Sequence, residues 1–166
     1  MTSTPRQKTR SSSKHDHSRC ISRALRSAEK VCKERDLQFT AIRRRVLELV
    51  WNEHSPVGAY EILASLKSGE AALAPPTVYR ALEFLLDAGL IHRIHALNAF
   101  IGCEQPEQEH AAQFLVCRSC KKVTEIADPD VAKLLAKTAK RAGFSAANQC
   151  VEIEDVCDSC RNTTDA

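Results

Sequence analysis

PPTVYRALEFLLDAG, residues 75–89, is the stretch that decides the fold of the N-terminal half of this chain. Pro75 and Pro76 are typical of the first turn of a helix, and Gly89 is typical of the position just beyond its last turn. Thr77, Tyr79 and Arg80 lie together near the start of the predicted helix, away from its apolar face. That face is a stripe of side chains at helical spacing, formed by Val78, Ala81, Leu82, Leu85 and Leu86.

The sequence on both sides of this helix predicts a winged helix-turn-helix. Upstream, apolar periodicity predicts three helices. The first covers residues 21–35, the second begins after a capping residue at Thr40, and the third covers residues 59–67. Downstream, residues 90–94 and 100–103 read as two strands around a turn near Leu97-Asn98. A helix-turn-helix inserts the start of its second helix into the major groove. There Arg80 can pair with guanine and Tyr79 can contact a phosphate or a thymine methyl group. An amphipathic helix with an ordinary polar surface is the alternative interpretation.

Composition restricts the class of protein. The chain has 166 residues, enough for one domain or two small lobes. Its first twenty residues are polar, and no apolar run approaches the length of a membrane span, so we expect neither a secretory signal nor a membrane protein. Eight cysteines without export favour reduced thiols in the cytoplasm. Residues 1–96 carry 16 Lys and Arg against 10 Asp and Glu, whereas residues 97–166 carry 8 against 11. This asymmetry favours a nucleic-acid reader coupled to a metal site.

Two Cys-x-x-Cys pairs, Cys117/Cys120 and Cys157/Cys160, predict a closed tetrahedral zinc site. The pairs are separated by 36 residues, so one metal ion would join two distant segments of the C-terminal half. The energy of metal binding would then contribute to folding. Two redox dithiols or disulfides are the alternative, and a thiol reagent would titrate them without releasing metal.

The C-terminal half is expected to contain one sheet and one covering helix. Strands are predicted over residues 113–118, 122–127 and 149–156, the last with Val151 and Ile153 facing inward. A helix is predicted from Pro129, capped by Asp128 and ended by Gly143. Its inward side chains are expected to be Val131, Leu134, Leu135 and Thr138. The predicted fold is α+β, with a disordered basic arm (1–19), a winged-helix domain (20–103) and a small αβ domain (104–166).

A second metal site is predicted at the junction of the two halves. If the hairpin turn centres on Leu97-Asn98, His92 lies directly opposite Cys103, with Cβ atoms about 5 Å apart on one face. His110 and Glu125 flank the same hinge along the sequence. Two imidazoles, one thiolate and one carboxylate suit Zn²⁺ better than iron. The alternatives are a histidine satisfied by the backbone, a buried structural cysteine and an exposed glutamate.

The residues 77–82 (TVYRAL), 84–92 (FLLDAGLIH) and the two cysteine pairs together resemble the ferric uptake regulator superfamily, and within it the zinc uptake regulator branch. The resemblance extends over roughly residues 21–160. It implies a dimeric, metal-dependent transcriptional repressor whose winged helix binds operator DNA and whose αβ domain forms the dimer. The stretch before the first cysteine pair carries only His110, whereas iron and peroxide sensors usually have a His-rich cluster there.

The resemblance also implies roles for individual residues. Cys117, Cys120, Cys157 and Cys160 match the structural zinc site, and His92, Cys103, His110 and Glu125 match the regulatory zinc site. Thr77, Tyr79 and Arg80 match the recognition helix, and Tyr60 matches a DNA-contacting tyrosine before it. We therefore expect a cytoplasmic, zinc-responsive repressor of zinc-uptake genes that is not an enzyme. It would bind about two zinc ions per chain and double-stranded operator DNA as a homodimer, with no membrane partner and no small-molecule substrate. The alternatives are an iron, manganese or peroxide sensor of the same superfamily, or a zinc-dependent hydrolase.

Overall fold

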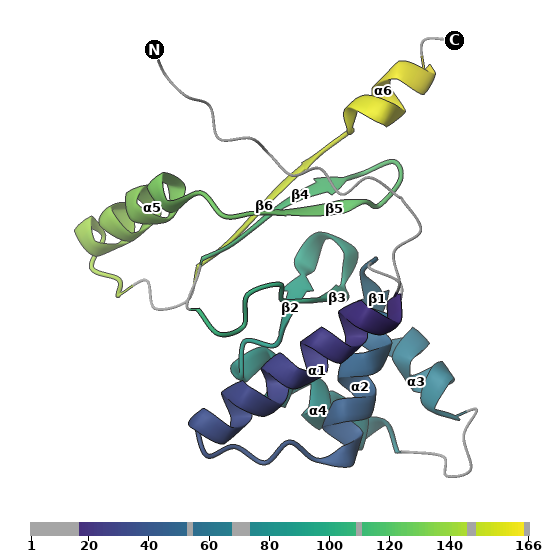
Figure 1. Ribbon diagram of the computed structural model, residues 1–166. Helices are drawn as coiled ribbons and strands as arrows, with labels where there is room; N and C mark the ends of the chain where they lie inside the picture. Colours follow the sequence, from purple (N-terminus) through teal and green to yellow (C-terminus); the bar gives the residue numbers. More distant parts are fainter. Residues whose placement is uncertain (1–16, 53–54, 68–73, 109–110, 146–148, 165–166) are drawn as a thin grey trace.

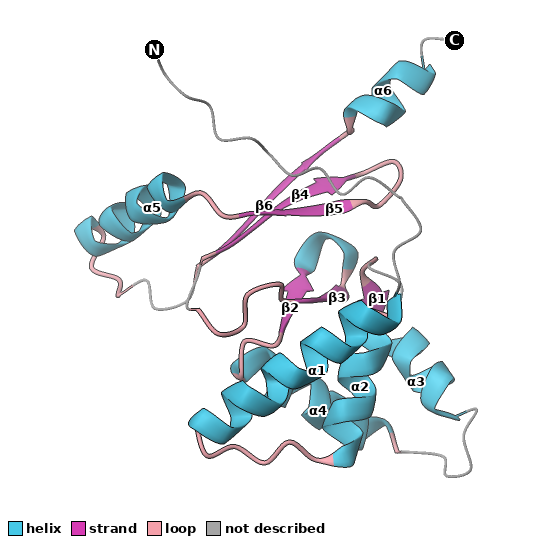
Figure 2. Cartoon of the chain, in the orientation of Figure 1, coloured by secondary structure: helices cyan, strands magenta, loops and turns pink. Residues whose placement is uncertain are grey.

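The computed structural model describes residues 17–52, 55–67, 74–108, 111–145 and 149–164 (Figure 1). In chain order the elements are α1 (His17–Glu34), α2 (Ala41–Trp51), β1 (Val57–Gly58), α3 (Ala59–Lys67), α4 (Pro75–Asp87), β2 (Ile91–Ile94), the 3-10 turn η1 (His95–Leu97), β3 (Ala99–Gly102), β4 (Ala112–Cys117), β5 (Val123–Ile126), α5 (Pro129–Arg141), β6 (Cys150–Asp155) and α6 (Asp158–Thr164). Figure 2 shows that helices α1 to α4 form one group below the wing, whereas α5 and α6 lie at the ends of the second sheet.

The four N-terminal helices pack around one apolar core. The predicted bounds of α3 and α4 are confirmed, and Gly89 takes a left-handed φ of 69° after α4. Thr40 occupies the cap position of α2, although its side chain makes no capping hydrogen bond. The arm predicted over residues 1–19 is wrong in its last three residues, because α1 already begins at His17. Residues 1–16 lie outside the described part of the chain.

The wing is a three-stranded sheet in the order β1-β3-β2 rather than the predicted hairpin alone. The predicted register is wrong: His92 lies opposite Ile101, not opposite Cys103. The reason is the turn, which contains the 3-10 segment η1 and Asn98 in a left-handed conformation (φ 47°), so the hairpin is centred one residue earlier. The partner shifts by two residues, which preserves side-chain alternation. Cys103, just beyond β3, therefore stays on the same face as His92, as its diagonal neighbour.

The backbone of β3 lies directly against the side chain of Trp51. A Cβ atom added to Gly102 would lie 2.1 Å from an indole carbon of Trp51, so no larger residue fits there without displacing the ring. Trp51 belongs to the core of the helical half and is 5 % exposed. This contact holds the end of the wing, and with it Cys103, against α2.

The second sheet has the order β5-β4-β6, in which β4 and β6 run parallel. One face of this sheet packs against the wing, where Phe114 and Val116 of β4 bury Ile94 of β2. The wing thus lies between two cores: Ile91 and Phe100 face the helices, whereas Ile94 and Ile101 face the second sheet. This position lets the second sheet act directly on the orientation of the wing.

The prediction that β6 turns its apolar side inward is wrong for Ile153, although Val151 is half-buried. Ile153 is 53 % exposed, and Leu115 of β4, which lies opposite it, is 38 % exposed. Glu152 projects from the other face of β6, because side chains alternate along a strand, and that face meets the wing. Sequence alternation finds the two faces of β6 but not which of them the rest of the chain covers.

The prediction that α5 covers the sheet is also wrong. The helix has its predicted start, where the Asp128 carboxylate accepts hydrogen bonds from the backbone N–H groups of Asp130 (2.8 Å) and Val131 (3.3 Å). None of its thirteen residues, all of which the structure describes, is buried, and the helix extends away from the sheet (Figure 1). The stripe expected to face inward is exposed, with Leu134 65 % and Leu135 37 % accessible.

Candidate metal centres and nucleic-acid interface

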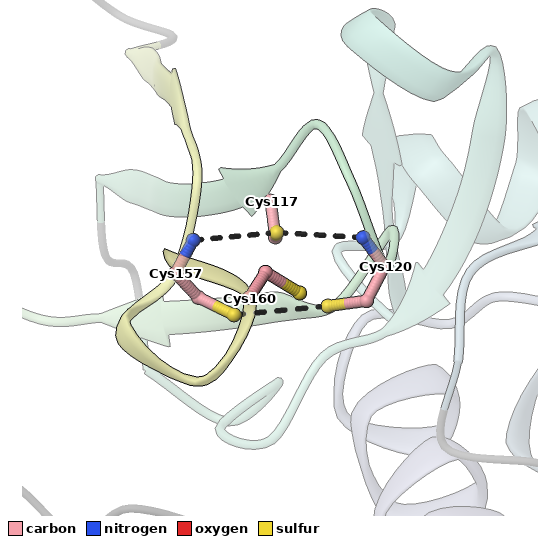
Figure 3. A group of neighbouring side chains, drawn as sticks. All are labelled: Cys117, Cys120, Cys157 and Cys160. Carbon is pink, nitrogen blue, oxygen red and sulfur yellow. Dashed lines mark hydrogen bonds between the residues drawn. The ribbon is translucent and has the colours of Figure 1, made fainter. Parts of the chain in front are cut away.

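The two cysteine pairs meet at one end of the second sheet (Figure 3). Cys117 ends β4 and lies opposite Asp155, the last residue of the parallel strand β6. Because the carboxyl ends of parallel neighbours share one edge, Cys157 follows β6 directly into the same space. Cys120 lies in the turn after β4, and Cys160 lies in the first turn of α6. The structure therefore brings the predicted cysteines together, as parallel pairing requires.

The sulfur atoms have the spacing that a tetrahedral zinc ion needs. All four Sγ atoms lie within 4.8 Å of one another, and those of Cys120 and Cys157 are 3.8 Å apart. Zinc–sulfur bonds of about 2.3 Å place neighbouring sulfurs about 3.8 Å apart. These residues therefore fit a zinc ion by donor type, number and separation.

Two backbone N–H groups stabilise the thiolate form of one cysteine of this cluster, Cys117. The Cys117 Sγ accepts hydrogen bonds from the N–H of Cys157 (3.4 Å) and of Cys120 (3.5 Å). These bonds lower the pKa of Cys117 to about 6, because they stabilise its thiolate. The pKa of Cys160 is raised to about 11, mainly by hydrogen bonding with the side chain of Cys157. Without metal the cluster thus carries protons that a bound zinc ion would displace.

Three residues predicted for the second site lie at the junction between the wing and the second sheet. The His92 Nε2 is 3.7 Å from an Oε of Glu125, across the gap between β2 and β5. The His92 ring also contacts Phe114 edge-on, with centroids 5.4 Å apart. Cys103 is 3 % exposed, and the charge of Glu125 contributes to raising its pKa. His110, the fourth predicted residue, lies outside the described part of the chain.

The environment of Cys103 makes its protonation sensitive to a cation. Burial, aided by the negative charges of Glu125 and Glu104, raises the pKa of Cys103 to about 12. Such a thiol stays protonated at neutral pH unless a cation replaces the proton. A divalent ion between His92, Cys103 and Glu125 would offset the same carboxylate charge that disfavours the thiolate.

The predicted DNA-facing residues are on the surface of the helical half. Tyr60, at the start of α3, is 80 % exposed, and Tyr79 in α4 is 41 % exposed. Arg80 is also exposed, and Thr77 is half-buried. By contrast, nearby arginines contact protein: the guanidinium of Arg43 lies 3.5 Å from the centroid of the Phe84 ring.

Two groups of contacts between the halves were not predicted from the sequence. Glu107, in the segment that follows Cys103, accepts a hydrogen bond from the Ser27 hydroxyl of α1 (3.3 Å) and forms an ion pair with Lys30. Glu152 of β6 accepts hydrogen bonds from the backbone of the wing turn. No local sequence signal marks either glutamate, since both partners lie far away along the chain.

Residues 34–154 match the model of the ferric uptake regulator family. This chain belongs to that family. It is 32% identical over 137 residues to the zinc uptake regulation protein of Escherichia coli K12, covering 82% of this chain and 80% of that protein. The fold is similar to a zinc uptake regulator complexed with zinc and DNA, with a TM-score of 0.79, 28% identity and coverage of 92% of this chain and 100% of that one.

Two crystal structures of XcZur distinguish between arrangements of the fold. The holo form matches with a TM-score of 0.77, 39% identity and coverage of 86% of this chain and 99% of that one. The apo form matches with a TM-score of 0.51, although its identity (38%) and coverage (85% and 97%) are nearly the same. The overall fold of this chain is therefore closer to the holo form of XcZur than to its apo form.

Among the described residues, no helix is long and apolar enough to cross a bilayer.

Proposed function

We propose that this protein is a zinc-responsive, DNA-binding transcriptional repressor of zinc-uptake genes, with zinc as its co-repressor. The observation that carries the proposal is the 3.7 Å approach of His92 Nε2 to Glu125 between the wing and the second sheet, with the buried thiol of Cys103 near enough for the charge of Glu125 to raise its pKa. Membership of a family of regulators, rather than of enzymes, agrees with it. The protein would act in the cytoplasm, where its thiols stay reduced.

Zinc would occupy two sites in each chain. The structural ion would be held by Cys117, Cys120, Cys157 and Cys160, whose four protein ligands leave no open position for hydrolytic chemistry. The regulatory ion would be held by His92, Cys103, His110 and Glu125. Its imidazole and thiolate ligands favour zinc over manganese or iron. A zinc supply would fill the second site and draw the wing toward the second sheet.

Operator DNA would be read by the winged helix, residues 20–103. Arg80 and Tyr79 would enter the major groove from the exposed start of α4, with Thr77 beside them and Tyr60 contacting the backbone. The basic character of residues 1–96 would attract the phosphates without base preference. The similar fold of a zinc uptake regulator complexed with zinc and DNA supports this use of the winged helix.

The remaining part, residues 104–166, would form the homodimer. Its exposed apolar side chains lie on α5, just after α5 and on the outer face of the second sheet, and comprise Leu115, Val131, Leu134, Leu135, Phe144 and Ile153. A second copy would bury this surface and leave both recognition helices free to contact one DNA duplex. Two linked half-sites would then bind far more tightly than one.

Zinc and DNA would be coupled because both favour the same arrangement of the wing. A ligand shifts a conformational equilibrium only by its difference in affinity for the two states. Zinc at the junction would favour the arrangement that matches DNA, and DNA would raise the affinity for zinc by the same factor. A coupling of about 1–3 kcal/mol, or 5–150-fold, is ordinary for such a system.

The proposal is tested by zinc-dependent DNA binding of His92→Ala and Cys103→Ser. A duplex enriched from a random-sequence pool by the zinc-loaded wild-type protein serves as the probe. We expect the wild-type affinity to rise about 5–150-fold with zinc and both variants to lose this response while keeping the structural ion. His95→Ala, on the wing turn rather than on a strand, is the control. A full zinc response in both variants would refute the regulatory site, and failure of the wild type to enrich DNA would refute the function.

A further inference from the structure

We infer that Glu152 is a positioning residue for DNA binding, because its carboxylate holds the turn of the wing against the second sheet. Its Oε1 accepts a hydrogen bond from the backbone N–H of His95 (2.7 Å) and its Oε2 accepts one from Ala96 (2.9 Å). Glu152 belongs to β6, whereas both amides belong to η1, 56 and 57 residues earlier. The contact therefore joins the second sheet to the wing independently of the residues proposed to bind zinc.

The chemistry of the turn explains why a carboxylate fits there. The first N–H groups of a helical turn have no acceptor within the turn, and Ile94, at the capping position of η1, has no side-chain oxygen. Glu152 supplies an acceptor for two successive N–H groups from the opposite half of the molecule. Hydrogen bonds to an ionised carboxylate are stronger than those between neutral groups.

The position of Glu152 allows the contact to fix the orientation of the wing hairpin. Glu152 lies opposite Phe114 in the register of β4 and β6, and Phe114 packs with Ile94, the residue just before η1. An apolar contact and a charged contact thus fix neighbouring points of the same hairpin. The effect of Glu152 on DNA binding rests on the proposed function. Because β2 follows α4 after only three residues, the orientation of this hairpin relative to the second sheet would set the orientation of the DNA-reading helix α4.

The structure that holds this contact is closer overall to the holo form of XcZur than to its apo form. With nearly equal sequence identity, the holo form of XcZur matches at a TM-score of 0.77 and the apo form at 0.51. The hydrogen bonds to Glu152 form only when the second sheet lies close to the wing turn, so they stabilise arrangements of the protein in which the two are in contact. Glu152 therefore adds to the effect of zinc without binding the metal.

The experiment compares Glu152→Gln and Glu152→Ala with Glu154→Gln, a change to an exposed glutamate on the same strand. The glutamine variant keeps the shape of the side chain but places an NH₂ group against an N–H donor. Operator affinity at saturating zinc should fall about tenfold in both Glu152 variants, with zinc content unchanged. Amide hydrogen exchange at His95 and Ala96, measured by NMR, should accelerate in both and not in the control.

The exchange measurement needs no DNA, so it separates this inference from the proposed function. If the wild-type protein failed to bind any duplex, the function would be refuted while the amide exchange still reported on the contact. Unchanged exchange at the two amides would overturn the inference. Unchanged operator affinity in the Glu152 variants would overturn it as well, because the contact would then be structural only.

Discussion

At the scale of the residue, the exposed guanidinium of Arg80 has the most specific role proposed here. Its place at the start of α4 suits bidentate hydrogen bonding to guanine, which reads one base rather than the backbone. Arg80→Ala should relax base preference at one operator position by about 1–3 kcal/mol. Binding to a panel of duplexes with single substitutions measures this effect.

Arg45→Ala is the matched control for Arg80, because it removes the same charge from the same half of the molecule. Arg45 lies on α2, where it pairs with Glu48 at 3.0 Å, away from the start of α4. We expect its loss to change the affinity for all duplexes alike, if at all. A uniform loss of affinity for Arg80→Ala would show that Arg80 contacts phosphate only.

At the scale of the element, α5 illustrates a helix whose partner is missing from its own chain. Leu134 is 65 % exposed in the middle of its apolar stripe, and the proposed dimer would bury it. Leu134→Glu should weaken the dimer at least about tenfold, because it would place an unpaired charge in an apolar interface. Analytical ultracentrifugation over a range of concentrations measures the change.

A control substitution to glutamate elsewhere on α5 tests whether the effect depends on the position of Leu134. Lys140→Glu adds the same side chain on the opposite side of α5 and should leave the dimer intact. Equal dimerisation of Leu134→Glu and wild type would show that α5 lies outside the interface. Both variants should retain the structural zinc ion, since the cysteine cluster lies at the other end of the sheet.

At the scale of the whole molecule, the cysteine cluster joins the end of β4 to α6 and so closes the C-terminal half. Cys117→Ser should remove about one zinc ion per chain, and the cooperative unfolding of that half should be lost with it. Metal content by mass spectrometry and thermal unfolding by circular dichroism measure the two effects. A serine hydroxyl cannot replace the thiolate, because it stays protonated at neutral pH.

Cys150→Ser is the control, because Cys150 is exposed and lies outside the cluster. Its zinc content and unfolding should match those of the wild type. A dimeric Cys117→Ser protein that unfolded cooperatively would contradict the structural role. In the wild type, zinc should be lost as the pH falls, since protons compete with the ion for thiolates and imidazoles.

Local sequence signals determined those parts of the protein that depend on neighbouring residues. Pro75 and Gly89 mark the ends of α4, and Asp128 caps α5, because helix termini are set by groups within one turn. The spacing of the cysteine pairs likewise indicates the zinc cluster, because each pair forms within a single turn. The family resemblance rests on these same local motifs.

Only the tertiary structure decided what depends on surfaces far apart in the sequence. The register of His92 was missed because a 3-10 turn moved the centre of the hairpin, and the inward face of β6 was reversed because the wing covers the side that carries Glu152. The apolar stripe of α5 was found, but not its exposure. Periodicity shows that an apolar face exists, whereas the element that covers it is chosen by the energy of packing the whole molecule.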